Sequence, residues 1–148
     1  MAVLRGGDRV DAYMAKIAAR IKKTGTLRVG FLEGATYDDG TPVAMIAAIQ
    51  NFGAPAMGIP PRPFFSNMIA AKSANWGPSL ARILHNNGYD VEKGLAMLGK
   101  GIAGQLRQSI VDTNAPPLAE ATIARKGFDK PLVDTSHMLN SIEAEVIT

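Results

Sequence analysis

The chain contains no cysteine and only two histidines among its 148 residues. Without cysteine it has no disulfides, thiolate nucleophiles, zinc ribbons or iron–sulfur clusters. The two histidines, His85 and His137, are too few for a histidine-built metal centre. We therefore expect that the protein holds neither a metal ion nor a cofactor.

Long apolar runs are absent as well. No stretch approaches the roughly 20 apolar residues that a membrane-spanning helix needs, and the N-terminus lacks a run of the signal-peptide type. Sixteen basic and thirteen acidic residues give a net charge of +3, which is distributed along the chain. We expect a soluble intracellular protein with no membrane partner, whose charge permits weak contact with nucleic acid without demonstrating it.

The apolar residues that are present make up 47% of the chain, an ordinary share for a globular protein. They recur at helical spacing over residues 8–23 and 91–110, and they alternate with polar residues over 26–33 and 142–148. A length of 148 residues suits one domain with one core. We predict a single α+β domain, residues 1–148, in which a small antiparallel or mixed β-sheet is flanked by several α-helices.

Glycine and proline mark the boundaries between these elements. Thr41 is expected to cap a helix that begins at Pro42, and Gly53 to end it in a left-handed conformation. Residues 54–63 contain four prolines, so this segment cannot be regular structure and is predicted to form an exposed or docked arm. The helical pattern that follows is expected to break at Gly77-Pro78.

A longer helix is predicted after Asp90, which is a suitable N-cap. Four glycines interrupt it, at positions 94, 99, 101 and 104. Each costs about 1 kcal/mol of helix propensity relative to alanine, which indicates close backbone packing there or a pliable helix. Loops are predicted at residues 113–117 and 127–134, with a short helix between them, and Thr135 or Ser136 is expected to cap a last helical turn.

Two segments, one glycine-rich and one acidic, resemble ligand sites, but neither is predicted to bind a ligand. Residues 94–101 come within one residue of a phosphate-binding loop, but Gly101 replaces the magnesium-binding Ser or Thr after Lys100, and no strand precedes the segment. Asp38 and Asp39 lack the further spaced oxygen ligands of a calcium loop, and Asp-Gly is typical of a turn.

The residue types of a hydrolase triad occur together at Asp134, Ser136 and His137. Neighbours in sequence seldom align a base, a nucleophile and an orienting carboxylate, and nothing nearby indicates an oxyanion hole. Polar capping of a helix start explains these residues better. We therefore predict no catalytic residue and no enzyme activity.

Two groups of residues are candidates for contacts with other molecules. Arg9, Arg20 and Lys22 lie in the basic first thirty residues and are candidates for a low-specificity surface facing DNA, although solvated helix charges explain them equally well. Prolines on both sides of Arg62 stiffen the backbone, while Phe64 and Phe65 supply apolar anchors. This arm is expected either to dock onto the helix at 42–52 or to contact another subunit.

Several segments together resemble the phage virion-morphogenesis proteins, a family that includes the head–tail joining, or tail-completion, proteins of long-tailed bacteriophages. The resemblance covers most of the chain, from about residue 27 to 142. The segments are 29–33 (VGFLE), 37–44 (YDDGTPVA) continuing to 51–53 (NFG), 59–64 (IPPRPF), 122–127 (TIARKG) and 130–135 (KPLVDT). One departure is Ser136, where such proteins commonly have glycine after Asp-Thr.

The resemblance implies an α+β structural protein of the virion that forms a ring, usually of six copies, at the junction of capsid and tail. It implies no catalytic residues. The implied partners are further copies of the chain, the head connector, the tail tube or tail terminator proteins, and double-stranded DNA passing through the lumen. Localisation would be the virion neck or top of the tail, and the host cytoplasm during assembly. A low-specificity DNA-binding protein is the alternative.

A ring also gives the unpaired sheet edges of a small sheet a partner in the next subunit. We therefore expect subunit or neck contacts in the loop 34–41 and the arm 54–65. The residues expected there are Tyr37, Asp38, Asp39, Ile59, Arg62, Phe64 and Phe65.

Overall fold

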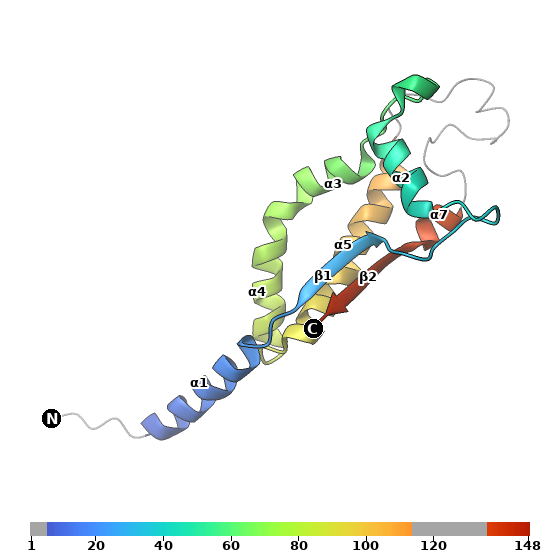
Figure 1. The fold of residues 1–148 in the computed structure, drawn as a ribbon. Helices are drawn as coiled ribbons and strands as arrows, with labels where there is room; N and C mark the ends of the chain where they lie inside the picture. Colours follow the sequence, from blue (N-terminus) through green and yellow to red (C-terminus); the bar gives the residue numbers. More distant parts are fainter. Residues whose placement is uncertain (1–5, 114–135) are drawn as a thin grey trace.

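The computed structural model describes residues 6–113 and 136–148, and its elements are shown in Figure 1. In chain order the elements are α1 (Gly7–Ile21), β1 (Thr26–Phe31), α2 (Val43–Phe52), η1 (Pro55–Met57), α3 (Phe64–Lys72), η2 (Ser73–Asn75), α4 (Trp76–Asn86), α5 (Val91–Asp112), α7 (Ser136–Asn140) and β2 (Ile142–Ile147). Of the loop predicted at residues 113–117, the structure describes only Thr113. The expected short helix, the 127–134 loop and a cap at Thr135 lie outside the described residues.

The sheet described is a two-stranded antiparallel ribbon that joins the two distant ends of the chain. β1 pairs with β2 from Thr26 opposite Ile147 to Phe31 opposite Ile142. The long helix α5 runs along one face of this ribbon (Figure 1). The prediction of an α+β fold with a small sheet flanked by helices is confirmed, and the sheet is antiparallel.

The core lies where α5 meets α2, α3 and the start of β2. Its fully buried side chains are Phe64, Leu106, Ile110, Ile142 and Val43. The apolar stripe expected along α5 supplies two of these, because residues spaced by three or four positions share one face of a helix. Asp90 caps α5 as predicted, its Oδ1 accepting a hydrogen bond from the Lys93 amide at 3.1 Å.

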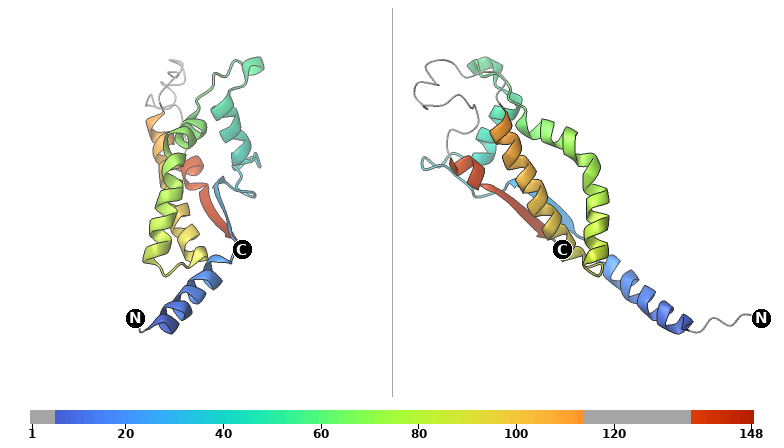
Figure 2. Two further views of the ribbon diagram at one scale, coloured as in Figure 1. Left: turned by 90° about the vertical axis from the view of Figure 1, so that its left-hand side faces the viewer. Right: turned by 180° about the vertical axis from the view of Figure 1, so that it is seen from behind.

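The predicted break at Gly77-Pro78 is wrong by a few residues. The chain bends at η2 instead, so that α3 and α4 form an arch beside α5 (Figures 1 and 2). Pro78 is the third residue of α4, where the missing amide hydrogen has no intrahelical acceptor to lose. Trp76 lies at the bend, and its Nε1 donates to Gln105 Oε1 of α5 at 2.9 Å.

The expected Thr41 cap of α2 is also wrong. Pro42 occupies the N-cap position, and no side chain caps this end. The Thr41 amide donates instead to Asp39 Oδ1 at 2.9 Å, which closes the turn before the helix. Gly53 does end α2, but not in the left-handed helical conformation expected, because its φ of 76° is combined with a ψ of 174°; this backbone still favours glycine over residues bearing a Cβ.

Candidate functional site

Helix α1 extends away from the rest of the described chain (Figures 1 and 2). None of its residues is buried. Val10, Tyr13, Met14 and Ile21 are 52–61% exposed, and Ile17 is half-buried. The amphipathic helix predicted from the sequence is therefore present, but its apolar side meets no surface within the described residues large enough to bury it.

The charges of α1 are arranged unequally about this apolar stripe. At about 100° per residue, Arg9, Lys16 and Arg20 fall on one flank of the stripe, while Asp8 and Asp11 fall on the opposite side of the helix. The Arg20 Nη1 donates to the Gly88 carbonyl at 2.6 Å, which links the end of α1 to the turn between α4 and α5.

The three residues expected to face DNA do not form one surface. Arg9 and Arg20 share a flank of α1, but Lys22 is the C-cap residue and lies on a different side of the helix axis. Arg20 is engaged by the Gly88 carbonyl. Within the described part of the chain, Arg9 and Lys22 are exposed cations pointing in separate directions.

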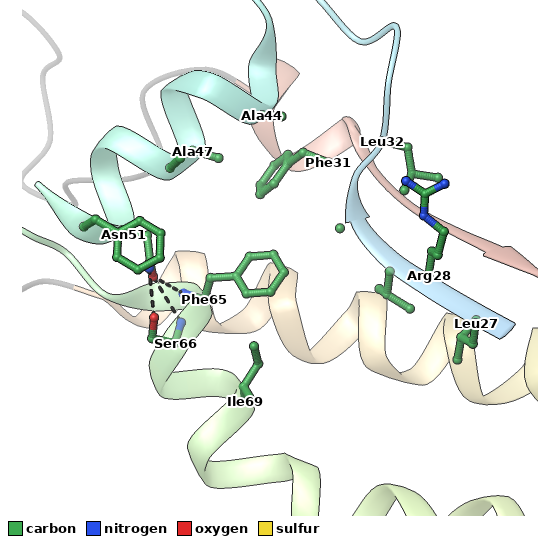
Figure 3. Close-up of a pocket in the computed structure, with 14 residues that line it drawn as sticks. Leu27, Arg28, Phe31, Leu32, Ala44, Ala47, Asn51, Phe65, Ser66 and Ile69 are labelled. Carbon is green, nitrogen blue, oxygen red and sulfur yellow. Dashed lines mark hydrogen bonds between the residues drawn. The ribbon is translucent and has the colours of Figure 1, made fainter.

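An apolar groove of about 710 Å³ lies between β1, α2 and α3 (Figure 3). It runs beside β1 from Leu27 to Leu32 and contains no residue of β2, so it follows the side of β1 that faces away from its partner strand. The side chains of Phe31 and Phe65 enter the space between α2 and β1, and Ile69 of α3, which is 40% exposed, lies at its lower end (Figure 3).

A smaller hollow of about 320 Å³ adjoins the groove on the side of α5. The two spaces share four lining residues, which are Leu27, Val29, Phe65 and Ile69. Trp76, Leu98 and Ile102 line the inner part. The apolar side chains beside β1 thus line two adjacent hollows and are not a scatter of single exposed residues.

Acidic side chains border this groove on the open face of the sheet. Glu33, Glu143 and Glu145 line a depression together with Arg28 and Leu32, and the last two also line the groove. Arg28 Nη1 lies 3.6 Å from Glu145 Oε2, with both side chains about half exposed. One arginine against three carboxylates leaves this border with an excess of negative charge.

The proline-rich arm docks within its own chain. The Arg62 amide donates to the Gln50 carbonyl of α2 at 2.7 Å, and the Arg62 side chain is 8% exposed. Its Nε has no hydrogen-bond partner among the residues that the structure describes, and burial lowers the pKa of the guanidinium from its usual range. Phe64 is completely buried. Of the two alternatives, the docking onto α2 is present in the structure, with Phe64 and Arg62 both buried. Contact of this arm with another subunit stays a prediction.

Asn51 joins this arm to α2, a role that no pattern in the sequence indicates. Its Oδ1 accepts hydrogen bonds from the amides of Phe65 and Ser66 at 3.0 and 3.1 Å, and its Nδ2 donates to Ser66 Oγ at 2.8 Å (Figure 3). These two amides belong to the first turn of α3, whose N-cap residue Pro63 contributes no side-chain bond. Asn51 therefore caps α3 from another helix.

The loop before α2 is a closed turn that rests against α7. The Gly40 amide donates to the Tyr37 carbonyl at 2.9 Å, as the turn interpretation of Asp38-Asp39-Gly40 predicts. The Thr41 amide, and then its hydroxyl, hold the pKa of the Asp39 carboxyl below its usual value. His137 Nε2 donates to the Thr36 carbonyl at 2.7 Å, and its ring centre lies 5.2 Å from that of Tyr37.

The remaining interface candidates differ in exposure. Asp38 and Asp39 are exposed, and Tyr37 and Ile59 are half-buried. Ile59 forms a bridge with Ala54 across the short turn of the arm. Phe65 is the one member of this set that lines the apolar groove. Contacts of these residues with another subunit stay a prediction.

The described residues offer little to a catalytic mechanism. No group of three His, Asp or Glu side chains among them is placed to hold a metal ion. Residues 94–101 lie inside α5, so their backbone amides serve the helix and do not form a phosphate loop. Asp134 of the triad-like set lies outside the described residues, and His137 bonds the Thr36 carbonyl. No helix among them is long and apolar enough to cross a bilayer.

Comparison with known proteins adds no relative to this picture. No family model, no curated protein and no solved structure matches the chain.

Proposed function

We propose that this protein is a structural subunit of a phage virion, which assembles with copies of itself into a ring at the neck. The ring completes the tail end, joins it to the head connector and leaves an axial passage for double-stranded DNA. Its protein partners are the connector and the tail tube or tail terminator proteins. A ring of six copies is expected from the resemblance of the sequence to head–tail joining proteins.

The observation that carries the proposal is the uncovered apolar stripe of α1. A monomeric protein seldom leaves a row of large apolar side chains in water, and contiguous exposed apolar surface commonly marks a protein interface. The chain also has an open apolar groove beside β1. A chain with two such surfaces suits assembly better than independent work in solution.

The proposal is tested by the oligomeric state and location of the protein. Sedimentation and electron microscopy of the purified chain are expected to show closed rings whose population rises with protein concentration. Antibody labelling of purified particles is expected to mark the junction of head and tail. A chain that stays monomeric at all concentrations and is absent from finished particles contradicts the proposal.

A low-specificity DNA-binding protein is the second candidate, supported by the exposed basic flank of α1. Phosphate contacts by lysine and arginine make DNA affinity fall steeply with salt. The purified subunit would then bind duplexes of unrelated sequence with similar affinity, and it would do so without forming rings. Tight binding by a monomer at physiological salt favours this candidate over the ring.

A further inference from the structure

We propose that α1 of each copy docks its apolar stripe into the groove beside β1 of the neighbouring copy. This inference rests on the proposed ring and names the contact that builds it. The stripe comprises Val10, Tyr13, Met14, Ile17 and Ile21. The groove is the space lined by β1, α2 and α3, including Phe31, Phe65 and Ile69.

The two surfaces match in length. A helix of 15 residues, the length of α1, spans about 22 Å at 1.5 Å per residue. A strand of six residues, the length of β1, spans about 20 Å at 3.3 Å per residue, and the groove accompanies the chain from Leu27 to Leu32. The apolar stripe of α1 can therefore lie along the whole groove, burying large side chains that are exposed on both partners.

The charges match as well. Beside the stripe, α1 carries the exposed basic side chains of Arg9 and Lys16, whereas Arg20 on the same flank is engaged by the Gly88 carbonyl of its own chain. Beside the groove lie the carboxylates of Glu33, Glu143 and Glu145, opposed only by Arg28 within that depression. A helix seated in the groove with its basic flank toward the sheet places opposite charges together, which favours one orientation over the reverse.

The link between α1 and β1 is held in place so that α1 points away from the groove of its own chain. Gly25 is packed so closely that a Cβ there would lie 2.8 Å from Leu95 Cδ1 and 3.7 Å from the Ile147 carbonyl oxygen. The bond from Arg20 to the Gly88 carbonyl fixes the end of α1 at the turn between α4 and α5. From this point α1 continues outward, beyond the end of the sheet (Figures 1 and 2).

Such a contact is heterologous, because a helix on one copy meets a groove on the next. Repetition of one heterologous contact produces a closed ring when the rotation between copies divides a full turn, and a filament when it does not. Each copy then uses both of its surfaces. The contact thus explains why one chain has an uncovered apolar helix and an uncovered apolar groove at the same time.

Cysteine cross-linking gives a direct test, because the chain has no cysteine of its own. A Met14→Cys chain mixed with an Ile69→Cys chain is expected to form a disulfide-linked dimer under mild oxidation. The matched control replaces Met14→Cys by Ala15→Cys, whose position is exposed on the other side of α1, and this mixture is expected to cross-link far less. Dimers are read on a non-reducing gel.

The charge arrangement has its own test. Lys16→Glu and Glu143→Lys, two exposed positions, are each expected to weaken self-association severalfold, and mixing the two variants is expected to restore much of the loss. Met14→Glu is expected to weaken it at least tenfold, and Ala15→Glu less than twofold. Since α1 has no buried residue and Glu143 is exposed on β2, these variants are expected to keep the circular dichroism and melting temperature of the parent chain.

The outcomes separate this inference from the proposed function. Rings that form without any Met14–Ile69 cross-link overturn the helix-in-groove contact and leave the ring standing. A chain that carries both Met14→Cys and Ile69→Cys distinguishes a contact within one copy from a contact between copies. If the disulfide forms only within this chain, and never between mixed single-cysteine chains, α1 covers its own groove and the proposed contact is overturned. A monomer that forms neither rings nor cross-links overturns both proposals.

Discussion

Gly99 of α5 lies directly against Leu27 of β1. A Cβ built on Gly99 would come within 2.8 Å of Leu27 Cδ1 and 2.9 Å of Ala144 Cβ, so the helix approaches both strands because this position has no side chain. Gly101, two residues further on, has nothing within 4 Å of the same atom. The four glycines of α5 therefore have different roles, although all carry the same cost in helix propensity.

Substitution by alanine should separate these roles. Gly99→Ala is expected to destabilise the protein by about 1–3 kcal/mol, because Leu27 can rotate away but the Cβ of Ala144 moves only with its strand. Gly101→Ala is expected to stabilise it by about 1 kcal/mol through helix propensity alone. Urea denaturation followed by circular dichroism measures both. Equal effects at the two positions would contradict the close packing of α5 on the sheet.

Asn51 is expected to be the most sensitive polar residue near the groove. Asn51→Ala leaves the Phe65 and Ser66 amides without their acceptor, at an expected cost of about 1–3 kcal/mol in unfolding free energy. Asn51→Asp keeps an acceptor at the N-terminus of α3 and is expected to lose less at neutral pH. The comparison is made by chemical denaturation, and an alanine variant as stable as the aspartate variant would show that the cap contributes little.

Because Phe64 and Arg62 are buried, substitutions of these residues are expected to lower the stability of the fold and not to affect assembly alone. Phe64→Ala removes a completely buried ring, and the expected loss is about 3–5 kcal/mol of stability. Phe52→Ala is the matched control, because that ring is 73% exposed, and a change within about 0.5 kcal/mol is expected. The melting temperatures of the two variants measure these two losses of stability. A Phe64→Ala chain that melts like the parent would place this ring outside the core.

The sequence allows prediction of elements whose signal is local. Alternation over residues 26–33 and helical spacing along α5 each reflect one face turned toward the core, and both elements are where the sequence places them. The shift of the break from Gly77-Pro78 to Ser73–Asn75 has a physical reason, since proline fits the first turn of a helix as well as it ends one.

Features that depend on tertiary structure were beyond prediction. The cap of α3 by Asn51 joins residues 14 and 15 positions apart, and asparagine near the end of α2 carries no sign of this partner. The groove combines side chains from three elements that are separated in the sequence. The apolar stripe of α1 was predictable from its spacing. The sequence does not show, however, whether another element of the same chain packs against that stripe.

The stability of the loop before α2 is expected to depend on pH through Asp39. Its pKa is lowered in the folded protein, so its hydrogen bonds to Thr41 contribute stability above the usual carboxyl pKa of 3.8, and this contribution is lost as the pH falls through the lower folded value. Asp39→Asn should therefore be less stable than the parent at pH 7 and approach it as the pH falls well below 3.8. Melting curves across this range test the prediction, and a difference that is constant with pH would contradict it.

Contact with DNA is expected to differ between the free subunit and the ring. In the free subunit Arg9 and Lys16 are exposed on the same flank of α1, and two phosphate contacts predict a slope of about −2 in a plot of log affinity against log salt, at about 0.9 per contact. Arg9→Glu should reduce this slope by about one, whereas Lys72→Glu, at an exposed position of α3, should not. In the ring, Arg9 would lie against the carboxylates beside the neighbouring groove, so the same substitution should leave the slope unchanged. Equal effects of Arg9→Glu on free subunits and rings would mean that this flank of α1 still faces DNA after assembly, which the helix-in-groove contact does not allow.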